Sequence, residues 1–120
     1  MKKTLFIFVI ILALVSCSND ENENSNDEIV GKWSLFSVSK KEVTDCEKKT
    51  TIDFRSNGVT ITETFQVLNS ECSRTSLIEN TWKNEGDNKY SFNNQQSSIE
   101  FDADGSSFRI VNGDIVYKKI

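Results

Sequence analysis

Three cysteines carry the most distinctive chemistry in this sequence: Cys17, Cys46 and Cys72. A thiol can be acylated, can form a disulfide, or can bind zinc as a thiolate. The sequence contains no His, so it lacks the commonest metal ligand and the usual general base near neutral pH. This absence excludes Ser-His-Asp and Cys-His catalysis, and no base accompanies the abundant Ser and Thr residues. We therefore assign no catalytic residue and expect a protein that is not an enzyme.

Cys17 follows a pattern that resembles the signal peptide of a bacterial lipoprotein. Lys2 and Lys3 precede an unbroken apolar run of 11 residues, Leu5–Val15, and Leu14-Val15-Ser16-Cys17 resembles a lipobox. A helix of this length rises about 17 Å against a hydrocarbon core of roughly 30 Å, so the run suits a signal peptide better than a membrane span. The resemblance implies cleavage of residues 1–16 and attachment of palmitate-type acyl chains to Cys17. An ordinary secretory signal followed by an unrelated Cys is the alternative.

Cys46 and Cys72 remain as a pair once Cys17 is acylated. An exported protein meets an oxidising environment, which favours a disulfide between them. The bond would close a loop of about 27 residues and stabilise the fold by about 3.5 kcal/mol in the chain-entropy model. Two free thiols, or half of a zinc site completed by carboxylates, are the alternatives.

The charge of the chain bears on its partners. The formal net charge is −4, and removal of Lys2 and Lys3 with the signal would make it two units more negative. An acidic surface is repelled by phosphates, which argues against binding of nucleic acid. It argues equally against charge-driven docking on anionic lipid. The membrane would be reached through the acyl chains, and two or more chains are needed for firm attachment.

Residues 18–28 (SNDENENSNDE) hold no hydrophobic side chain and predict a flexible, disordered acidic tether. Such a segment spans roughly 20 Å root-mean-square. Acidic residues just after the acylated Cys, here Asp20-Glu21, resemble the export signals that send some Gram-negative lipoproteins to the outer face of the outer membrane. We therefore expect a lipid-anchored outer-membrane protein at the cell surface. The periplasmic face, with the segment acting only as a spacer, is the alternative.

Residues 29–120 form one predicted all-β domain. Short segments of alternating hydrophobicity are separated by turn residues, and Asn57-Gly58 predicts a tight hairpin because both residues tolerate positive φ. Two polar loops, 40–49 and 69–76, hold the paired cysteines. The predicted strands lie at residues 30–39, 50–55, 59–68, 77–84, 89–93, 97–101, 106–111 and 115–120.

The first strand places Trp33 and Leu35 on one face and Phe36 and Val38 on the other, which predicts a bulge. Eight antiparallel strands joined mostly by hairpins predict an up-and-down barrel, because closure removes the exposed edges. The interior of an eight-stranded barrel is either filled by side chains or left open for one small ligand.

The order of several weak motifs resembles the lipocalin-like domain of small Gram-negative lipoproteins. The matching residues are Gly31, Trp33 and Leu35 in the first strand, Cys46, Phe54-Arg55-Ser56-Asn57-Gly58, Cys72 and Trp82. The resemblance covers residues 29–120 and implies that Gly31 and Trp33 form the barrel floor, with Arg109 packed over the Trp ring. This chain is shorter than a full lipocalin, so its cavity is small or filled.

A candidate ligand cavity follows from strand alternation. Glu63 has the parity of Ile61 and Phe65, so a regular strand would point its carboxylate into the barrel. There it would anchor the polar end of a ligand, with Phe65, Trp82 and Tyr90 as apolar lining. A bulge, or a place at the barrel mouth, is the alternative for Glu63, and simple core packing is the alternative for the aromatic residues.

No metal or cofactor is expected. Asp102-Ala103-Asp104-Gly105 begins like a calcium loop but lacks the further oxygen ligands and the late Glu, so we interpret it as a hairpin turn. The resemblance implies a lipid-anchored binding protein of the cell envelope for a small apolar or amphipathic ligand. The alternative is a surface protein-interaction module, such as a lysozyme or protease inhibitor, with a filled barrel.

Overall fold

The computed structural model describes residues 26–120. The predicted signal peptide, Cys17 and residues 18–25 of the predicted tether lie outside the described residues. Within residues 26–120, no helix has both the length and the apolar character needed to cross a membrane.

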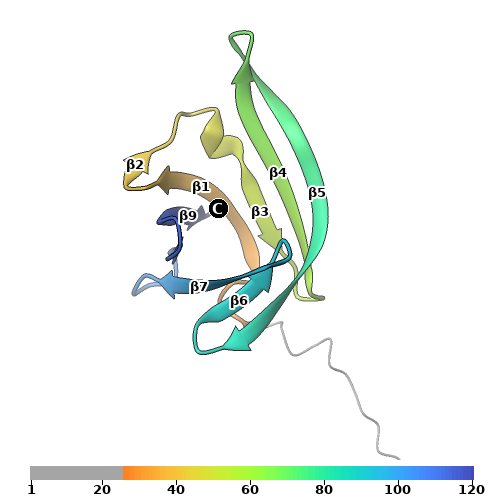
Figure 1. Ribbon diagram of the computed structural model, residues 1–120, viewed down its shortest axis with the longest axis vertical. Coiled ribbons are helices and arrows are strands. Elements are labelled where there is room, and N and C mark those ends of the chain that lie inside the picture. Colours follow the sequence, from red (N-terminus) through yellow and green to blue (C-terminus); the bar gives the residue numbers. More distant parts are fainter. Residues whose placement is uncertain (1–25) are drawn as a thin grey trace, which may run out of the picture.

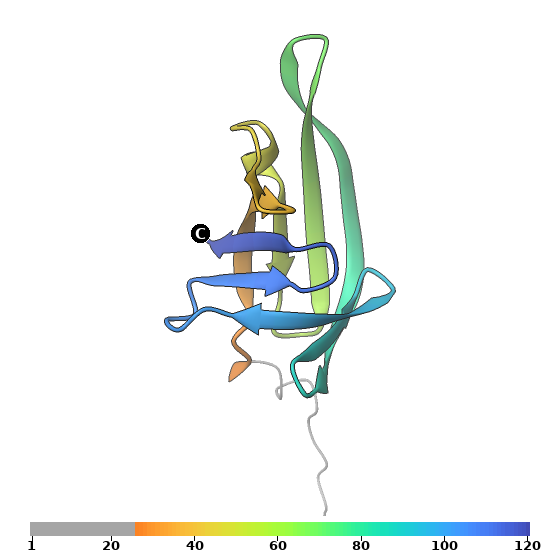
Figure 2. The ribbon, with the colours of Figure 1, turned by 60° about the vertical axis from the view of Figure 1, so that its left-hand side comes forward.

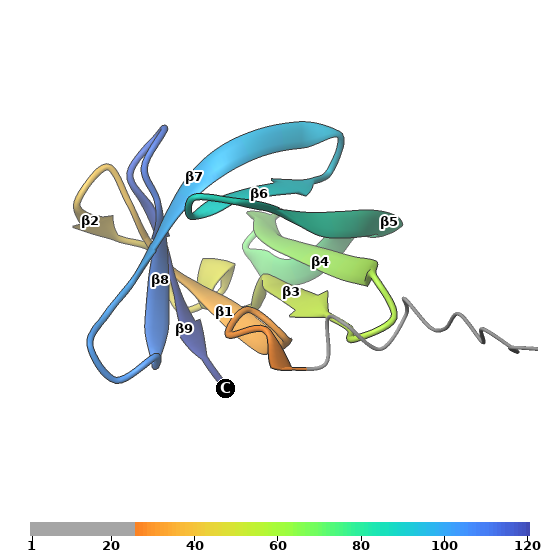
Figure 3. The same cartoon turned by 90° about the horizontal axis from the view of Figure 1, so that it is seen from below.

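Eight strands of the described chain close into an antiparallel barrel, as predicted (Figures 1 and 3). Neighbours pair in chain order, and pairing of the last strand with the first completes the ring. The remaining strand, β2, has two residues, pairs with β1 and is not part of the ring. The bounds are β1 (Gly31–Val38), β2 (Lys41–Glu42), β3 (Thr51–Phe54), β4 (Val59–Leu68), β5 (Glu71–Gly86), β6 (Lys89–Phe92), β7 (Gln95–Phe101), β8 (Ser107–Ile110) and β9 (Ile115–Lys119), with a 3₁₀ helix, η2 (Glu47–Lys49), before β3.

Two-residue turns explain why the chain follows this meander. Both residues have positive φ in the turns Asn69-Ser70, Asp87-Asn88 and Asn93-Asn94. Turns with this backbone match the twist of the strands they join, and Asn and Asp tolerate them well. The predicted polar loop 69–76 is therefore wrong, because the chain reverses within two residues and β5 begins at Glu71.

The predicted bulge in the first strand is confirmed. Leu35 lies opposite Tyr117 of β9, and Ser37 lies opposite Val116, so Phe36 is the extra residue. The bulge lets the apolar side chains of β1 change face without breaking the seam that closes the barrel.

The closed end of the barrel is filled with aromatic side chains. Phe54 is fully buried and makes edge-to-face contacts with Trp82, Phe92 and Phe108, with ring centres 5.3 to 6.1 Å apart. Such pairs add about 0.5–1.5 kcal/mol each beyond the burial of their area. The buried core residues are Ile29, Trp33, Ile52, Phe54, Trp82, Tyr90, Phe92, Ile99, Phe108, Ile110 and Tyr117.

β4 presents its threonines to the barrel interior. Thr60 lies opposite Phe54 and Thr62 lies opposite Ile52, and both of these β3 residues are buried in the core. Opposed residues of antiparallel strands point to the same face. The apolar residues that alternate with the threonines, Val59, Ile61, Phe65 and Val67, therefore lie on the outer face.

Candidate functional site

A hollow of about 210 Å³ opens at one end of the barrel, above the packed core. Its apolar surface comes from four strands and its polar surface from amides and a hydroxyl. The lining residues are Ile52, Phe92, Ile110, Ile115 and Tyr117 on the apolar side, and Asn93, Gln95, Ser97 and Asn112 on the polar side. This combination of an apolar base and a few polar groups is typical of small-molecule sites.

Strand register sets the polar side of the hollow. Gln95 lies opposite Phe92, and Ser97 lies opposite Tyr90, across the β6–β7 hairpin. Because Phe92 and Tyr90 point into the core, Gln95 and Ser97 also face the interior. The turns β6–β7 and β8–β9 then place Asn93 and Asn112 at the rim.

No charged side chain lines the hollow in the described part of the chain. The hydroxyl of Thr62, beside Ile52 on the inner wall, is buried without a hydrogen-bond partner among the described residues. An unsatisfied buried hydroxyl is costly, but Thr62 is not among the residues that line the hollow. The site therefore offers uncharged hydrogen-bonding groups only.

Two of the predicted cavity residues point inward but close the opposite end of the barrel. The indole N–H of Trp82 donates to the Arg55 carbonyl at 2.7 Å. The Tyr90 hydroxyl donates to the Asp27 carboxylate at 2.6 Å, and burial together with this bond raises the pKa of Tyr90. Tyr90 and Trp82 are both almost fully buried and neither lines the hollow.

The other two predicted cavity residues lie on the outer face, which corrects the parity expected for β4. Glu63 lies opposite Leu77, an exposed residue, and its carboxylate pairs with Arg74 at 3.3 Å. Phe65 has the same parity as Glu63, and it lies opposite Arg74. Glu63 is therefore a surface ion-pair partner, and it does not reach the interior.

The floor contains Trp33 as expected, but a different cation lies over it. Trp33 is fully buried and donates its indole N–H to the Ile29 carbonyl at 2.8 Å. The Nζ of Lys119 lies 5.2 Å from the Trp33 ring centre. Arg109 does not pack there, because it lies on the outer face and its guanidinium pairs with Glu100 at 2.6 Å.

Gly31 begins β1 beside this floor and is required there for two reasons. Its φ of +140° lies in a region that side chains disfavour. A Cβ at this position would also lie 3.0 Å from the Cε of Lys119. Gly31 at the start of β1 and Lys119 at the end of β9 therefore lie against each other at one end of the closing seam.

The predicted disulfide between Cys46 and Cys72 is confirmed, with a Cα–Cα distance of 5.5 Å. It ties the loop before β3 to the start of β5, on the outer side of the barrel wall. A shallow hollow of about 350 Å³ lies beside it, lined by Thr44, Glu47, Gln66, Val67 and Leu68.

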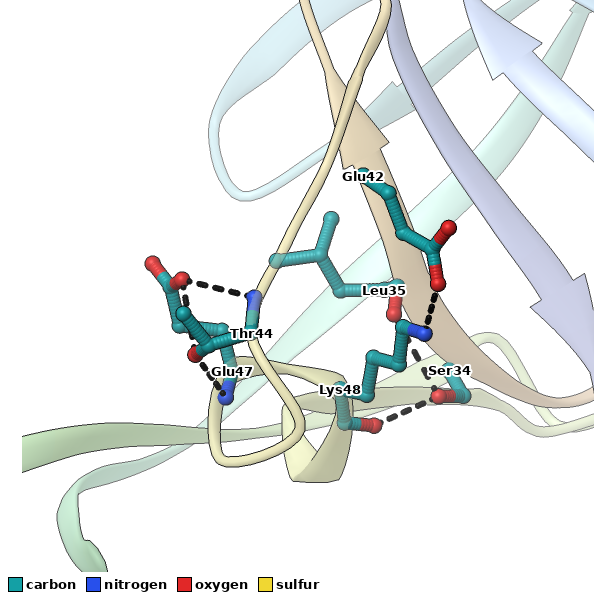
Figure 4. Close-up of polar contacts among 6 residues, drawn as sticks. All are labelled: Ser34, Leu35, Glu42, Thr44, Glu47 and Lys48. Carbon is teal, nitrogen blue, oxygen red and sulfur yellow. Dashed lines mark hydrogen bonds and ion pairs between the residues drawn. The ribbon is translucent and has the colours of Figure 1, made fainter.

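Side-chain bonds hold the loop that carries Cys46 (Figure 4). The Thr44 N–H donates to the Glu47 carboxylate at 3.1 Å, and the Glu47 N–H donates to the Thr44 hydroxyl at 3.2 Å. This reciprocal pair closes the turn that leads into η2, whose N-cap residue is Cys46. Lys48 pairs with Glu42, and the Ser34 hydroxyl donates to the Lys48 carbonyl at 2.5 Å.

In the acidic turn after β7, the carboxylate of Asp102 accepts hydrogen bonds from residues of the same turn. The Asp102 carboxylate accepts bonds from the hydroxyls of Ser107 at 2.8 Å and Ser106 at 3.1 Å. The Ser107 hydroxyl is the main reason that the pKa of Asp102 falls to about 2. No group of three or more potential metal ligands occurs in residues 26–120.

A comparison with protein-family models matches residues 29–114 to the lipocalin-like domain. The chain belongs to this family. The match covers seven of the eight barrel strands, β1 and β3 to β8, and ends in the β8–β9 turn. A comparison with curated proteins found no match.

Sequence reasoning missed the residues that form the polar side of the lipocalin-like hollow, and it missed Lys119. Asn93 and Asn112 were interpretable as turn residues, so their types gave no separate sign of a site. Gln95 and Ser97 could have been found from the inward parity of Ile99 on the same strand.

Proposed function

We propose that this lipocalin-like protein binds a small, uncharged, amphipathic molecule in the hollow at the open end of its barrel. The observation that carries the proposal is the lining itself, with an apolar base and only neutral amide and hydroxyl groups at the rim. The volume, about 210 Å³, is below the roughly 300–1,000 Å³ of sites for drug-sized ligands. The ligand is therefore short, or its apolar end enters while the rest stays outside.

Among residues 26–120, no cationic side chain lines the hollow, which supports a neutral ligand. A carboxylate placed against Phe92 and Ile110 would lose its hydration without gaining a charged partner. The formal net charge of −4 adds a repulsive field for anions. A hydroxyl or amide would instead form hydrogen bonds with the rim groups.

A pair of ligands of matched length tests this proposal. We expect octanol to bind the purified protein at least about tenfold more tightly than octanoate, a difference of about 1.4 kcal/mol. Ser97→Phe, which fills the hollow from the inner face of β7, should abolish binding of octanol. Ser98→Phe changes the neighbouring residue of the same type on the outer face and should leave it intact. Equal loss in both variants, or tighter binding of octanoate, would contradict the proposal.

We further propose that the protein is a bacterial lipoprotein anchored in the outer membrane through acylated Cys17, and that it faces the cell surface. The basic, apolar and lipobox segments of residues 1–17 support this anchor. Along β6, Tyr90 bonds Asp27 at the closed end, and Phe92 reaches the hollow. The segment that leads to the anchor would therefore join the closed end, and the hollow would face away from the lipid.

Incorporation of labelled palmitate tests the anchor, with Cys17→Ser as the variant and Cys46→Ser as the matched control. We expect the label in the wild-type chain and in the control, and no label in Cys17→Ser. Cleavage of the protein by protease added to intact cells would support the surface location. Protection until the outer membrane is opened would place the protein on the periplasmic face instead.

Protein recognition is a second candidate function, because the projecting part of the β4–β5 hairpin carries exposed apolar side chains. Val67 is 55% exposed and Leu68 is 49% exposed, next to the disulfide that fixes the hairpin. An inhibitor of lysozyme or a protease would use this surface without catalysis of its own. The test is the activity of lysozyme or a protease in the presence of the purified protein. Inhibition of that activity would support this role only if Val67→Ser relieves the inhibition and Ser97→Phe does not.

A further inference from the structure

Most of β5 has one edge without a strand partner. Residues 71–81 pair with β4, whereas β6 pairs only with the later part of β5, from Trp82 to Gly86. Within the described chain the other edge of residues 71–81 therefore has no strand beside it, and the hairpin projects from the barrel (Figures 1 and 2). A long free edge is a template for pairing with another strand.

This edge lacks two of the residue types that most often prevent pairing, Pro and Lys. The sequence from 71 to 81, ECSRTSLIENT, contains no Pro and no Lys. Leu77 is 54% exposed on the outer face, and Ile78 is 49% exposed on the inner face. An edge with apolar side chains on both faces is suited to extension of the sheet.

The direction of the backbone groups can be derived from the existing pairing. The Trp82 N–H donates to the Gly58 carbonyl, on the β4 side. Alternate residues of an antiparallel strand direct both backbone groups to the same neighbour. Leu77, Glu79 and Thr81 therefore present their N–H and C=O groups to the free edge.

The charges on this edge complement one another about a twofold axis. Arg74, Leu77 and Glu79 share the outer face, because they lie opposite β4 residues of the same parity. The register shift leaves Thr75 as an extra residue, so Arg74 and Glu79 are each two paired positions from Leu77. An antiparallel copy centred on Leu77 would place each Glu79 beside an Arg74.

We propose that the free edge of β5 pairs with the same edge of a second copy of this chain, centred on Leu77. The contact joins two hairpins into one continuous sheet, with Leu77 against Leu77 at the axis and two Glu79–Arg74 ion pairs beside it. The twofold contact uses the free β5 edge of each copy, so no such edge remains for a third copy and the assembly stops at a dimer.

Crossed charge variants test the register. Arg74→Glu places four acidic side chains at the axis, and Glu79→Lys places four basic ones, so each variant alone should be monomeric. When the two full-length variants carry different tags and are produced together, the mixed pair restores both ion pairs and should co-purify. Co-purification within either variant alone, or none in the mixture, would overturn the proposal.

A cysteine at the axis gives an independent readout. Opposed residues in a hydrogen-bonded antiparallel pair have Cα atoms about 5.5 Å apart, which a disulfide can bridge. Leu77→Cys in the full chain should therefore give a dimer on a non-reducing gel. Val67→Cys, an equally exposed apolar position on β4 away from the free edge, should not. Equal cross-linking at both positions, or none at Leu77→Cys, would overturn the proposal. Hydrogen exchange gives a further check, because protection of the free β5 edge in a monomer would also overturn the proposal.

Discussion

Lys119 lies over Trp33, with its Nζ 5.2 Å from the ring centre, and the two residues are directly opposed across the β1–β9 seam. The seam is the contact that turns an open meander into a ring. A cation over the indole face strengthens the seam at the point where the core begins, because the ring face carries negative charge density.

Replacement of Lys119 should weaken the closed end more than replacement of Arg109. We expect Lys119→Met to lower the free energy of unfolding by about 0.5–1 kcal/mol through loss of the cation. Arg109→Met removes only surface ion pairs with Glu100 and Asp114, whose median worth is about 0–1 kcal/mol. Urea unfolding followed by indole fluorescence measures both. A larger loss for Arg109→Met would show that the ion pairs, and not the Trp33 contact, secure the seam.

Substitution of Gly31 should destabilise the fold through strain and overlap together. Gly31→Ala places a Cβ 3.0 Å from Lys119 at a φ of +140°. Gly86→Ala is the matched control, because its φ of +87° is also unfavourable but no atom lies within 4 Å of the added Cβ. Strain alone costs about 1 kcal/mol or more, and Gly31→Ala should exceed the control in thermal unfolding. Equal losses would mean that Lys119 moves aside freely.

Removal of the disulfide should lower stability without closing the hollow. The bond joins residues 26 positions apart, and the double substitution Cys46→Ala with Cys72→Ala should cost about 3.5 kcal/mol. Of the residues that the bond encloses, only Ile52 lines the hollow, and it lies in β3, beyond the loop that carries Cys46. Urea unfolding should therefore shift to lower concentration while octanol affinity stays within about twofold of wild type. A parallel loss of octanol affinity would mean that the loop shapes the interior.

Alkaline pH should unfold the protein as its tyrosines ionise. Burial raises the pKa of Tyr117 to about 12, and burial with the Asp27 bond raises that of Tyr90 as well. Below pH 10 both phenols are protonated in either state, so this contribution to stability is fully present. Above pH 10 only the unfolded chain ionises, and stability falls by up to about 1.4 kcal/mol per pH unit for each tyrosine.

Absorbance at the phenolate band tests this directly, because Tyr90 and Tyr117 are the two tyrosines of the sequence. We expect no phenolate signal near pH 10 and a cooperative rise at higher pH that coincides with loss of the fold. Ionisation of one tyrosine near pH 10 in the folded protein would contradict its burial.

The fold could be predicted because closure depends on patterns that are local in the chain. Alternating segments and tight turns such as Asn57-Gly58 determine a meander of eight strands, and the face switch around Phe36 gives the bulge in β1. The disulfide followed from the cysteine count and the expected compartment. The family match covers all of these strands except β9.

The prediction of which face of β4 points inward was wrong, because the alternating apolar residues of this strand do not lie on the core side. Thr60 and Thr62 face the interior, where they pack against β3, whereas Phe65 and Val67 lie on the outer face near the disulfide loop. The Phe65 N–H is bonded to the Thr50 hydroxyl, next to η2. A loop that covers an outer face can thus make it as apolar as an inner one.

The hollow could not be predicted as a site because its rim combines residues of β7 with two Asn residues from separate turns. Two strands, β7 and β8, separate Asn93 from Asn112 in the chain, and the two residues line one hollow only once β6 to β9 have paired. Each is explained locally by turn chemistry, since Asn favours such positions. A site of this kind becomes recognisable only once the register of β6, β7 and β8 is known.

The backbone amide spectrum of the purified protein, recorded during titration with octanol, tests the central claim most directly. The claim predicts saturable shifts at Asn93, Gln95, Ser97 and Asn112, with little change at Val67 and Leu77 on the projecting hairpin. Saturable shifts at the hairpin with none at the four rim residues, or no saturable shifts at all, would contradict it.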